Sequence, residues 1–177
     1  LYEHRSTVLH AMLASSPAVL GLSSADVLLP VVPLFHAAAW GTPFAAPMAG
    51  TKLVFSAVND PKVLCGLMNE ERVTISSGVP TVWLAMFAYA DATGESPRHL
   101  RMATIGGSAA PRAMIARLMG MGVDVKHLWG MTETSPVATA AAPPPDWDDW
   151  SEDAKLDVLT KQGRIPYGVE LAVIDDE

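Results

Sequence analysis

The sequence predicts an α/β fold in which helices flank a doubly wound and mainly parallel sheet. First, short apolar runs alternate with segments of helical periodicity, and the connections between them are short. Second, the run at 26–32 is apolar without alternation, which is typical of a strand covered on both faces. Third, 50% hydrophobic residues in a chain of 177 are ample for a buried core. The order strand, helix, strand, helix implies parallel strands with right-handed crossovers.

Charge, cysteine content and hydropathy exclude several classes of protein. The formal net charge of -7 and the lack of a Lys/Arg cluster argue against a nucleic-acid partner. Cys65 is the single cysteine, so an internal disulfide is excluded and we expect a reducing compartment, by default the cytoplasm. No apolar run is long enough to cross a bilayer as a helix. The chain opens in a helical pattern and stops just after an expected strand, so we expect an excerpt from a longer protein.

The first third of the chain supplies two helices and two strands. Apolar residues at helical spacing predict a helix over 2–13, which Pro17 terminates. The unalternating strand at 26–32 follows. The alanine-rich stretch 37–49 is too apolar for a surface loop and predicts one closely packed helix. A short strand is expected at 52–55.

Two further helices have clear start signals. Asp60 followed by Pro61 is an N-cap with proline at the first helical position, and Pro80 starts another helix after the turn at Gly78 and Val79. A strand at 73–76 separates them, and a polar connection at 91–98 follows. The residues expected to face the core are Val63, Leu64, Leu67 and Met68 in the first helix, and Val82, Trp83, Met86 and Phe87 in the second.

The pattern continues to about residue 137 and then changes. A strand at 102–105, a tight turn at 106–110, a helix at 111–121 and a strand at 123–127 complete the doubly wound core, expected to span 1–137. The inward residues of that helix are Met114, Ile115 and Leu118. The proline-rich and acidic stretch 138–150 is expected to be a long excursion of the chain away from the doubly wound core. The remaining segment, 151–177, is expected to hold a helix to about 161 and a strand at 169–174.

The stretch 128–134 concentrates groups that suit a nucleotide. Trp129 offers a flat face for a base, Gly130 permits close approach of the backbone to a phosphate, and Thr132 offers a hydroxyl. Glu133 offers a hard oxygen ligand for Mg²⁺. The alternative is an ordinary turn after a strand, with a buried tryptophan and a solvated glutamate.

Three glycine-bearing turns follow three successive predicted strands, at 78–81, 106–111 and 129–133. The carboxyl ends of parallel strands share one edge of the sheet, so these turns should border one crevice. The helix that starts at Pro111 would add its amino end, which favours anions. His36 is expected at the same edge, with Trp40 lining the same cavity. For each of these two side chains, ordinary core packing is the alternative.

Four ordered motifs resemble the AMP-forming acyl-CoA synthetases of the adenylate-forming superfamily. They are Pro-Leu-Phe-His-Ala-Ala-Ala-Trp-Gly at 33–41, Gly-Val-Pro-Thr-Val-Trp at 78–83, Gly-Gly-Ser-Ala-Ala-Pro at 106–111 and Trp-Gly-Met-Thr-Glu-Thr-Ser-Pro at 129–136. The resemblance covers essentially the whole chain and is greatest to the medium- and long-chain fatty acyl-CoA ligase branch. It implies a central piece of the N-terminal domain of such a ligase.

The resemblance also implies a reaction and a nucleotide site. ATP and a carboxylate give an acyl-adenylate and pyrophosphate, and coenzyme A then displaces AMP. Thr132 would contact the α-phosphate and Glu133 would hold Mg²⁺. Trp129 stands where the superfamily usually has a tyrosine against the adenine. The other residues implied to border the nucleotide are Gly107, Ser108, Ala109, Gly130 and Met131.

On the substrate side, the resemblance places His36 beside the reacting carboxylate, which makes it the third candidate catalytic residue with Thr132 and Glu133. Trp40 matches the gate of a fatty-acid tunnel, and Gly78 and Val79 would line that tunnel. The family's phosphate loop, its ribose-binding aspartate and its C-terminal domain are not found in these residues, so we expect the isolated chain to be inactive.

Two other functions are left open by the sequence. One is a ligase for short-chain or methylthio-carboxylates, because pocket depth depends on side chains that the motifs do not place. The other is a non-catalytic binding module of flavodoxin-like shape. For the ligase, a homodimeric parent is a further expectation.

Overall fold

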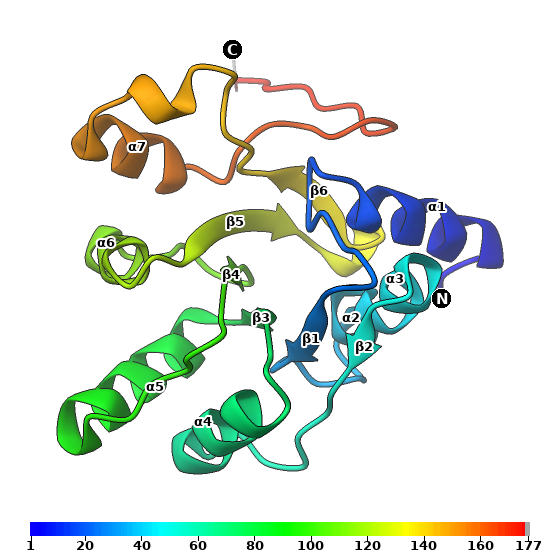
Figure 1. Ribbon diagram of the computed structural model, residues 1–177. Helices are drawn as coiled ribbons and strands as arrows, with labels where there is room; N and C mark the ends of the chain where they lie inside the picture. Colours follow the sequence, from blue (N-terminus) through cyan, green and yellow to red (C-terminus); the bar gives the residue numbers. More distant parts are fainter. Residues whose placement is uncertain (176–177) are drawn as a thin grey trace.

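A computed structural model describes residues 1–175 and contains one six-stranded sheet (Figure 1). Its strand order is β2-β1-β3-β4-β5-β6. The first five strands in that order run parallel, and β6 pairs antiparallel with β5. The predicted mainly parallel sheet is therefore confirmed. The strands are β1 (Val27–Pro30), β2 (Lys52–Leu53), β3 (Ile75–Gly78), β4 (Met102–Ile105), β5 (Asp124–Gly130) and β6 (Val137–Ala140).

Helices cover both faces of the sheet, as a doubly wound fold requires. Figure 1 shows α4, α5 and α6 on one side and α1 and α3 on the other. The helices are α1 (His4–Ser15), α2 (Ala37–Trp40), α3 (Thr42–Ala49), α4 (Pro61–Glu70), α5 (Pro80–Thr93), α6 (Arg112–Gly120) and α7 (Glu152–Leu159), with short 3-10 helices η1 (Thr132–Thr134) and η2 (Trp147–Asp149). No helix within residues 1–175 has both the length and the apolar content needed to cross a membrane.

The best predicted helices are those with local start signals. The carboxylate of Asp60 accepts a hydrogen bond from the backbone N–H of Val63 at 3.0 Å, which caps α4 as expected. The predicted core residues are buried in α4 at Leu64 and Met68, in α5 at Trp83, Met86 and Phe87, and in α6 at Met114, Ile115 and Leu118. Leu67 and Val82 are half-buried. Val63 was predicted wrongly, because it lies on the outer side of the first turn and is 46% exposed.

The stretch 37–49 is not one helix. Ala37, Ala38, Ala39 and Trp40 all have positive φ angles, between 48° and 56°, and form a left-handed turn. Gly41, at φ 73°, then joins this turn to the right-handed helix α3. Alanine content predicts a packed helical segment but says nothing about handedness, and left-handed residues cost about 1–2 kcal/mol each. Tertiary contacts must therefore hold α2, and Ala39 is fully buried within them.

Three expected boundaries also differ. The sheet continues into the stretch 138–150, because Val137–Ala140 pairs with β5 and is buried. Helix α5 continues through Thr93, so the connection expected at 91–98 is shorter. No strand forms at 169–174, where most residues are exposed and none pairs with a strand within residues 1–175. Asp176 and Glu177, the last residues of the expected segment 151–177, lie outside the described residues.

Candidate functional site

The carboxyl ends of the parallel strands meet at one edge of the sheet. Gly78, the last residue of β3, pairs in register with Ile105, the last residue of β4, and Gly106 and Gly107 follow directly. Ile105 pairs in turn with His127 of β5. The predicted turns at 78–81 and 106–111 therefore begin at the same level of the sheet. The third differs, because β5 continues through Trp129 and Gly130 and the turn starts only at Met131.

A cavity of about 210 Å³ lies at this edge. It brings together most of the residues proposed from the sequence for the nucleotide and the substrate. Five of the proposed residues do not line the cavity, namely Gly78, Val79, Ser108, Ala109 and Glu133. The residues that do are His36, Ala37, Trp40, Gly106, Gly107, Leu128, Trp129, Gly130, Met131, Thr132, Pro136 and Val137.

Glycines allow the backbone and the Trp40 ring to approach closely. A Cβ added at Gly106 would lie 3.2 Å from the carbonyl oxygen of Leu128 and 3.3 Å from Cη2 of Trp40. Gly107 has a φ of 78°, and a Cβ there would lie 3.1 Å from Cγ1 of Val79. The side chain of Val79 therefore packs next to Gly107, although Val79 does not line the cavity. Side chains at either position would displace Trp40 or fill the space beside it.

The end of β5 is fixed by a second close approach. A Cβ at Gly130 would lie 1.8 Å from the carbonyl oxygen of Pro136, so only glycine fits between β5 and the segment that enters β6. The register of the β5–β6 pair shifts between Trp129 and Gly130. Because of this bulge, Trp129 and Gly130 do not pair regularly with β6 where they line the cavity. The glycine that the sequence suggested for phosphate approach is thus also required by chain packing.

Thr134 organises the turn that follows. Its hydroxyl accepts a hydrogen bond from the backbone N–H of Met131 at 2.8 Å and lies 2.5 Å from the carbonyl oxygen of Pro136. These contacts close η1 and leave Thr132 and Glu133 exposed at its start. Thr134 had no role assigned from the motifs in the sequence. Its spacing from Met131, three residues, is the local signal for such a turn.

Tyr2 is a second residue beside the site to which no motif in the sequence points. Partial burial raises the pKa of its hydroxyl above the ordinary 10.0, and the nearby Glu133 carboxylate raises it further, against a lowering by the Thr132 hydroxyl. The amino end of α1 therefore lies beside the exposed residues of η1. No sequence pattern connects positions 2 and 132, because the contact depends on the packing of α1 against the end of β5.

The residues present fit a magnesium ion only in part. Within residues 1–175, no three His, Cys, Asp or Glu side chains are close enough together to enclose a metal. Mg²⁺ in nucleotide sites usually keeps several waters and takes one or two carboxylates together with the substrate phosphates. A single exposed carboxylate at Glu133 is consistent with that kind of binding. It is not consistent with a metal held by the protein alone.

His36 and Trp40 enter the cavity from the segment after β1. His36 is exposed and directly precedes the left-handed turn, while Trp40 ends that turn half-buried. They are not related by one turn of a right-handed helix, as expected from the sequence. They nevertheless line the same cavity as Trp129 and Thr132.

Comparison with known proteins is consistent with the motifs. The profile of the AMP-binding enzyme family matches residues 1–177. A medium-chain-fatty-acid–CoA ligase from Ectopseudomonas oleovorans is 47% identical over 179 residues, and a 3-methylmercaptopropionyl-CoA ligase from Ruegeria pomeroyi is 43% identical. Each alignment covers 100% of this chain and 33% of the relative, so the chain spans about a third of their length. The N-terminal domain of FACL13 from Mycobacterium tuberculosis has a TM-score of 0.78 at 26% identity, over 94% of this chain and 40% of that one.

Proposed function

We propose, since the chain belongs to the family of AMP-binding enzymes, that it forms one wall of the nucleotide site and the entrance to the acyl pocket of an ATP-dependent fatty acid–CoA ligase. The observation that carries this proposal is the shared cavity. It joins the Trp129 to Thr132 segment to His36 and Trp40, which come from a different part of the chain. Medium- or long-chain acids are the proposed substrates, because a medium-chain ligase is 47% identical.

Each residue of the nucleotide half has a separate task, including Ser108, Ala109 and Glu133, which do not line the cavity but directly follow lining residues in the chain. The indole of Trp129 stacks on the adenine, and Gly107, Ser108 and Ala109 border it. The Thr132 hydroxyl donates a hydrogen bond to an α-phosphate oxygen, and Glu133 binds Mg²⁺. Mg²⁺ held by Glu133 would neutralise charge on the phosphates while the carboxylate attacks the α-phosphorus and pyrophosphate leaves. Gly130 and Met131 place this segment against the ligand through their backbone.

In the acyl half, His36 and Trp40 orient the substrate. His36 is exposed at the cavity mouth, so it can donate a hydrogen bond to the carboxylate that attacks the α-phosphate. Trp40 lies against Gly106, and in this proposal it gates the acyl tunnel that Gly78 and Val79 line. In the second step, the thiol of coenzyme A attacks the acyl carbon and AMP leaves. The proposal includes action in the cytoplasm, where the free Cys65 stays reduced, and a homodimeric parent.

The test is Glu133→Gln in a protein of the length of the relatives, assayed by carboxylate-dependent release of pyrophosphate. Loss of the Mg²⁺ ligand should lower kcat by about a hundredfold or more. Glu70→Gln on the outer face of α4 removes an exposed carboxylate far from the cavity and should leave the rate unchanged. Full activity in Glu133→Gln would contradict the proposed role. The chain of 177 residues alone is expected to release no pyrophosphate.

A ligase for methylthio-carboxylates is the second candidate, because a 3-methylmercaptopropionyl-CoA ligase is 43% identical to this chain. Activity on straight-chain acids of rising length, with 3-methylthiopropionate in the same series, separates the two. A maximum of kcat/KM at the thioether acid would replace the fatty-acid proposal.

A further inference from the structure

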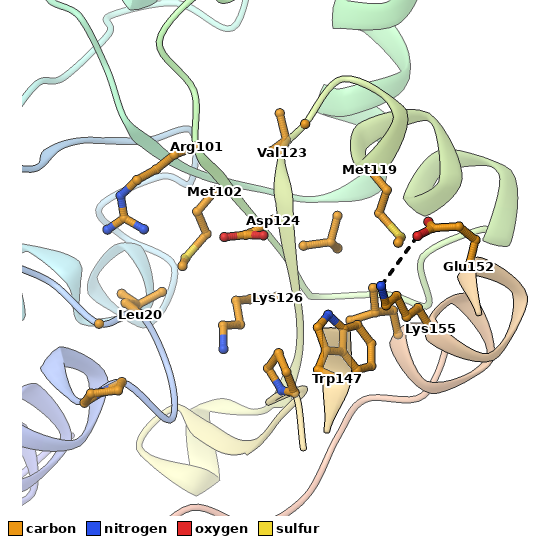
Figure 2. A pocket seen from close by; sticks show the side chains of 16 residues that line it. Leu20, Arg101, Met102, Met119, Val123, Asp124, Lys126, Trp147, Glu152 and Lys155 are labelled. Carbon is orange, nitrogen blue, oxygen red and sulfur yellow. Dashed lines mark ion pairs between the residues drawn. The ribbon is translucent and has the colours of Figure 1, made fainter. Parts of the chain in front are cut away.

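A second cavity, of about 460 Å³, lies at the opposite edge of the sheet, where β4 and β5 begin (Figure 2). Leu20, Met102, Met119 and Trp147 contribute apolar walls. They come from the loop after α1, from the start of β4, from the end of α6 and from η2. None of the residues proposed for the nucleotide or the substrate lines this cavity.

Lys126 of β5 is the unusual residue of this cavity. It is only 8% exposed, and no hydrogen bond or ion pair joins its ammonium group to any residue within 1–175. Figure 2 shows its side chain leaving the strand and ending in the space between Leu20 and Trp147. Buried lysines are rare unless they are paired, because removal of an ammonium group from water is costly. The rest of the side chain is buried while its unpaired ammonium reaches the cavity, and this arrangement indicates an acceptor that binds there.

The other charged groups around the cavity mostly have partners. Arg101 pairs with Asp26 at 2.8 Å, and Lys155 pairs with Glu152 at 3.6 Å, the dashed contact in Figure 2. Asp124, on the same face of β5, is exposed at the mouth. Arg164 lines a smaller adjoining cavity that Lys126 also borders.

These charges restrict the acceptor. Lys126 and Arg164 each carry a positive charge and Asp124 carries a negative one, so their net charge matches a ligand with one negative charge better than a ligand with two. The apolar walls would remain in contact with water around a compact ion such as phosphate. A ligand with one negative charge and an apolar body satisfies both conditions.

We propose that this cavity is a second binding site, specific for a small monocarboxylate whose oxygens accept hydrogen bonds from Nζ of Lys126 and whose apolar body packs on Trp147. Burial lowers the pKa of Lys126, and the nearby Asp124 opposes that lowering. A bound carboxylate would supply the missing partner and hold the amine in its charged form.

The experiment measures protection of Lys126 from acetylation by acetic anhydride, read by mass spectrometry of the peptide, with benzoate as the probe. Benzoate should slow labelling of Lys126 by about fivefold or more and leave the exposed Lys62 unprotected. By calorimetry, Lys126→Met should weaken benzoate binding by about tenfold, Lys126→Arg should retain it, and Lys62→Met should have no effect. Because protection is read in the unaltered protein, the result does not depend on the folding of a variant.

Two further arms distinguish this site from its alternatives. Inorganic phosphate at equal ionic strength should protect Lys126 less than benzoate does, and equal protection would overturn the specificity for a monocarboxylate. Trp129→Ala alters only the nucleotide edge and should leave protection of Lys126 by benzoate unchanged. If that variant abolishes protection, or if benzoate gives none in the unaltered protein, the second site does not exist.

Discussion

At the scale of single residues, two buried basic side chains, His10 and Lys126, have no hydrogen-bond partner for a side-chain nitrogen within residues 1–175, whereas the fully buried His127 is bonded to Ala110 and Leu159. Nε2 of His10 is buried without a hydrogen bond among the described residues, and the residue is 6% exposed. Its ring packs on Gly41, where an added Cβ would lie 2.4 Å from Cε1 and Nδ1. An unsatisfied buried group costs stability, and such groups need a reason to be present. For His10 the reason in the structure is steric, because its flat ring fills the space over the left-handed turn.

Burial lowers the pKa of His10 from 6.5 to about 4, and this has a direct consequence for acid stability. The unfolded chain binds the proton at higher pH than the folded chain does. The contribution to stability is therefore complete above about pH 6.5 and is lost as the pH falls to about 4, a difference of about 3 kcal/mol at most.

We expect His10→Phe, which keeps a flat ring without a titratable nitrogen, to flatten this part of the pH dependence. Urea unfolding of both proteins at pH 7 and pH 4.5 measures it. His99→Phe, at an exposed histidine, should retain the full dependence of the unaltered protein. Equal slopes in His10→Phe and the unaltered protein would show that His10 titrates normally.

At the scale of elements, local signals decided which predictions succeeded. Helix α4 could be predicted because Asp60 and Pro61 fix its start within the sequence itself. The turn α2 could not, because its handedness depends on Gly41, His10 and the burial of Ala39, which are tertiary facts. The residues at 169–174 have the composition of a strand, but pairing requires a neighbour that composition does not supply.

The candidate site could likewise be predicted only where it does not depend on tertiary contacts. Its location at the carboxyl edge could be predicted from topology, and Trp129, Gly130, Thr132, His36 and Trp40 do share one cavity. The hydroxyl of Thr134 and the proximity of Tyr2 could not, since they depend on how η1 folds back and on where α1 packs.

The left-handed turn makes a sharp prediction at Gly41. Alanine there must adopt a φ near 73° and also displace the His10 ring, so Gly41→Ala should lower the free energy of unfolding by about 2–4 kcal/mol. Gly66→Ala is the matched control, because Gly66 lies inside α4 and an added Cβ meets nothing within 4 Å. That change should stabilise the protein by up to about 1 kcal/mol. Similar values for the two variants in urea unfolding would contradict the strain proposed for α2.

At the scale of the whole molecule, the α1 and α3 face carries an exposed apolar surface. Leu9 and Met12 of α1 are 55% and 56% exposed, and Phe44 and Met48 of α3 are 47% and 55% exposed. Apolar residues do recur at helical spacing in α1, but Leu9 and Met12 do not face the core. The buried residues of α1 are His10, Ala11 and Ala14. Apolar patches of this kind promote association in water.

We expect the 177-residue chain to self-associate through this face as its concentration rises. Light scattering should show a mass that increases with concentration, and the double variant Leu9→Lys, Met12→Lys should reduce the increase. Leu84→Lys, at a residue of α5 that is 51% exposed on the other side of the sheet, is the control for added charge alone. A monomer at all concentrations, or an equal effect of the control, would exclude this face as the contact.

Strand β5 runs from Asp124 to Gly130, and therefore passes beneath both cavities. Its first half borders the space around Lys126, and its last residues border the space around Trp129. Residues 124–127 of β5 pair with β4, and residues 128–130 pair with β6, so the two halves of one strand are held by different neighbours. Hydrogen–deuterium exchange along this single segment would therefore register occupancy at either end of the sheet.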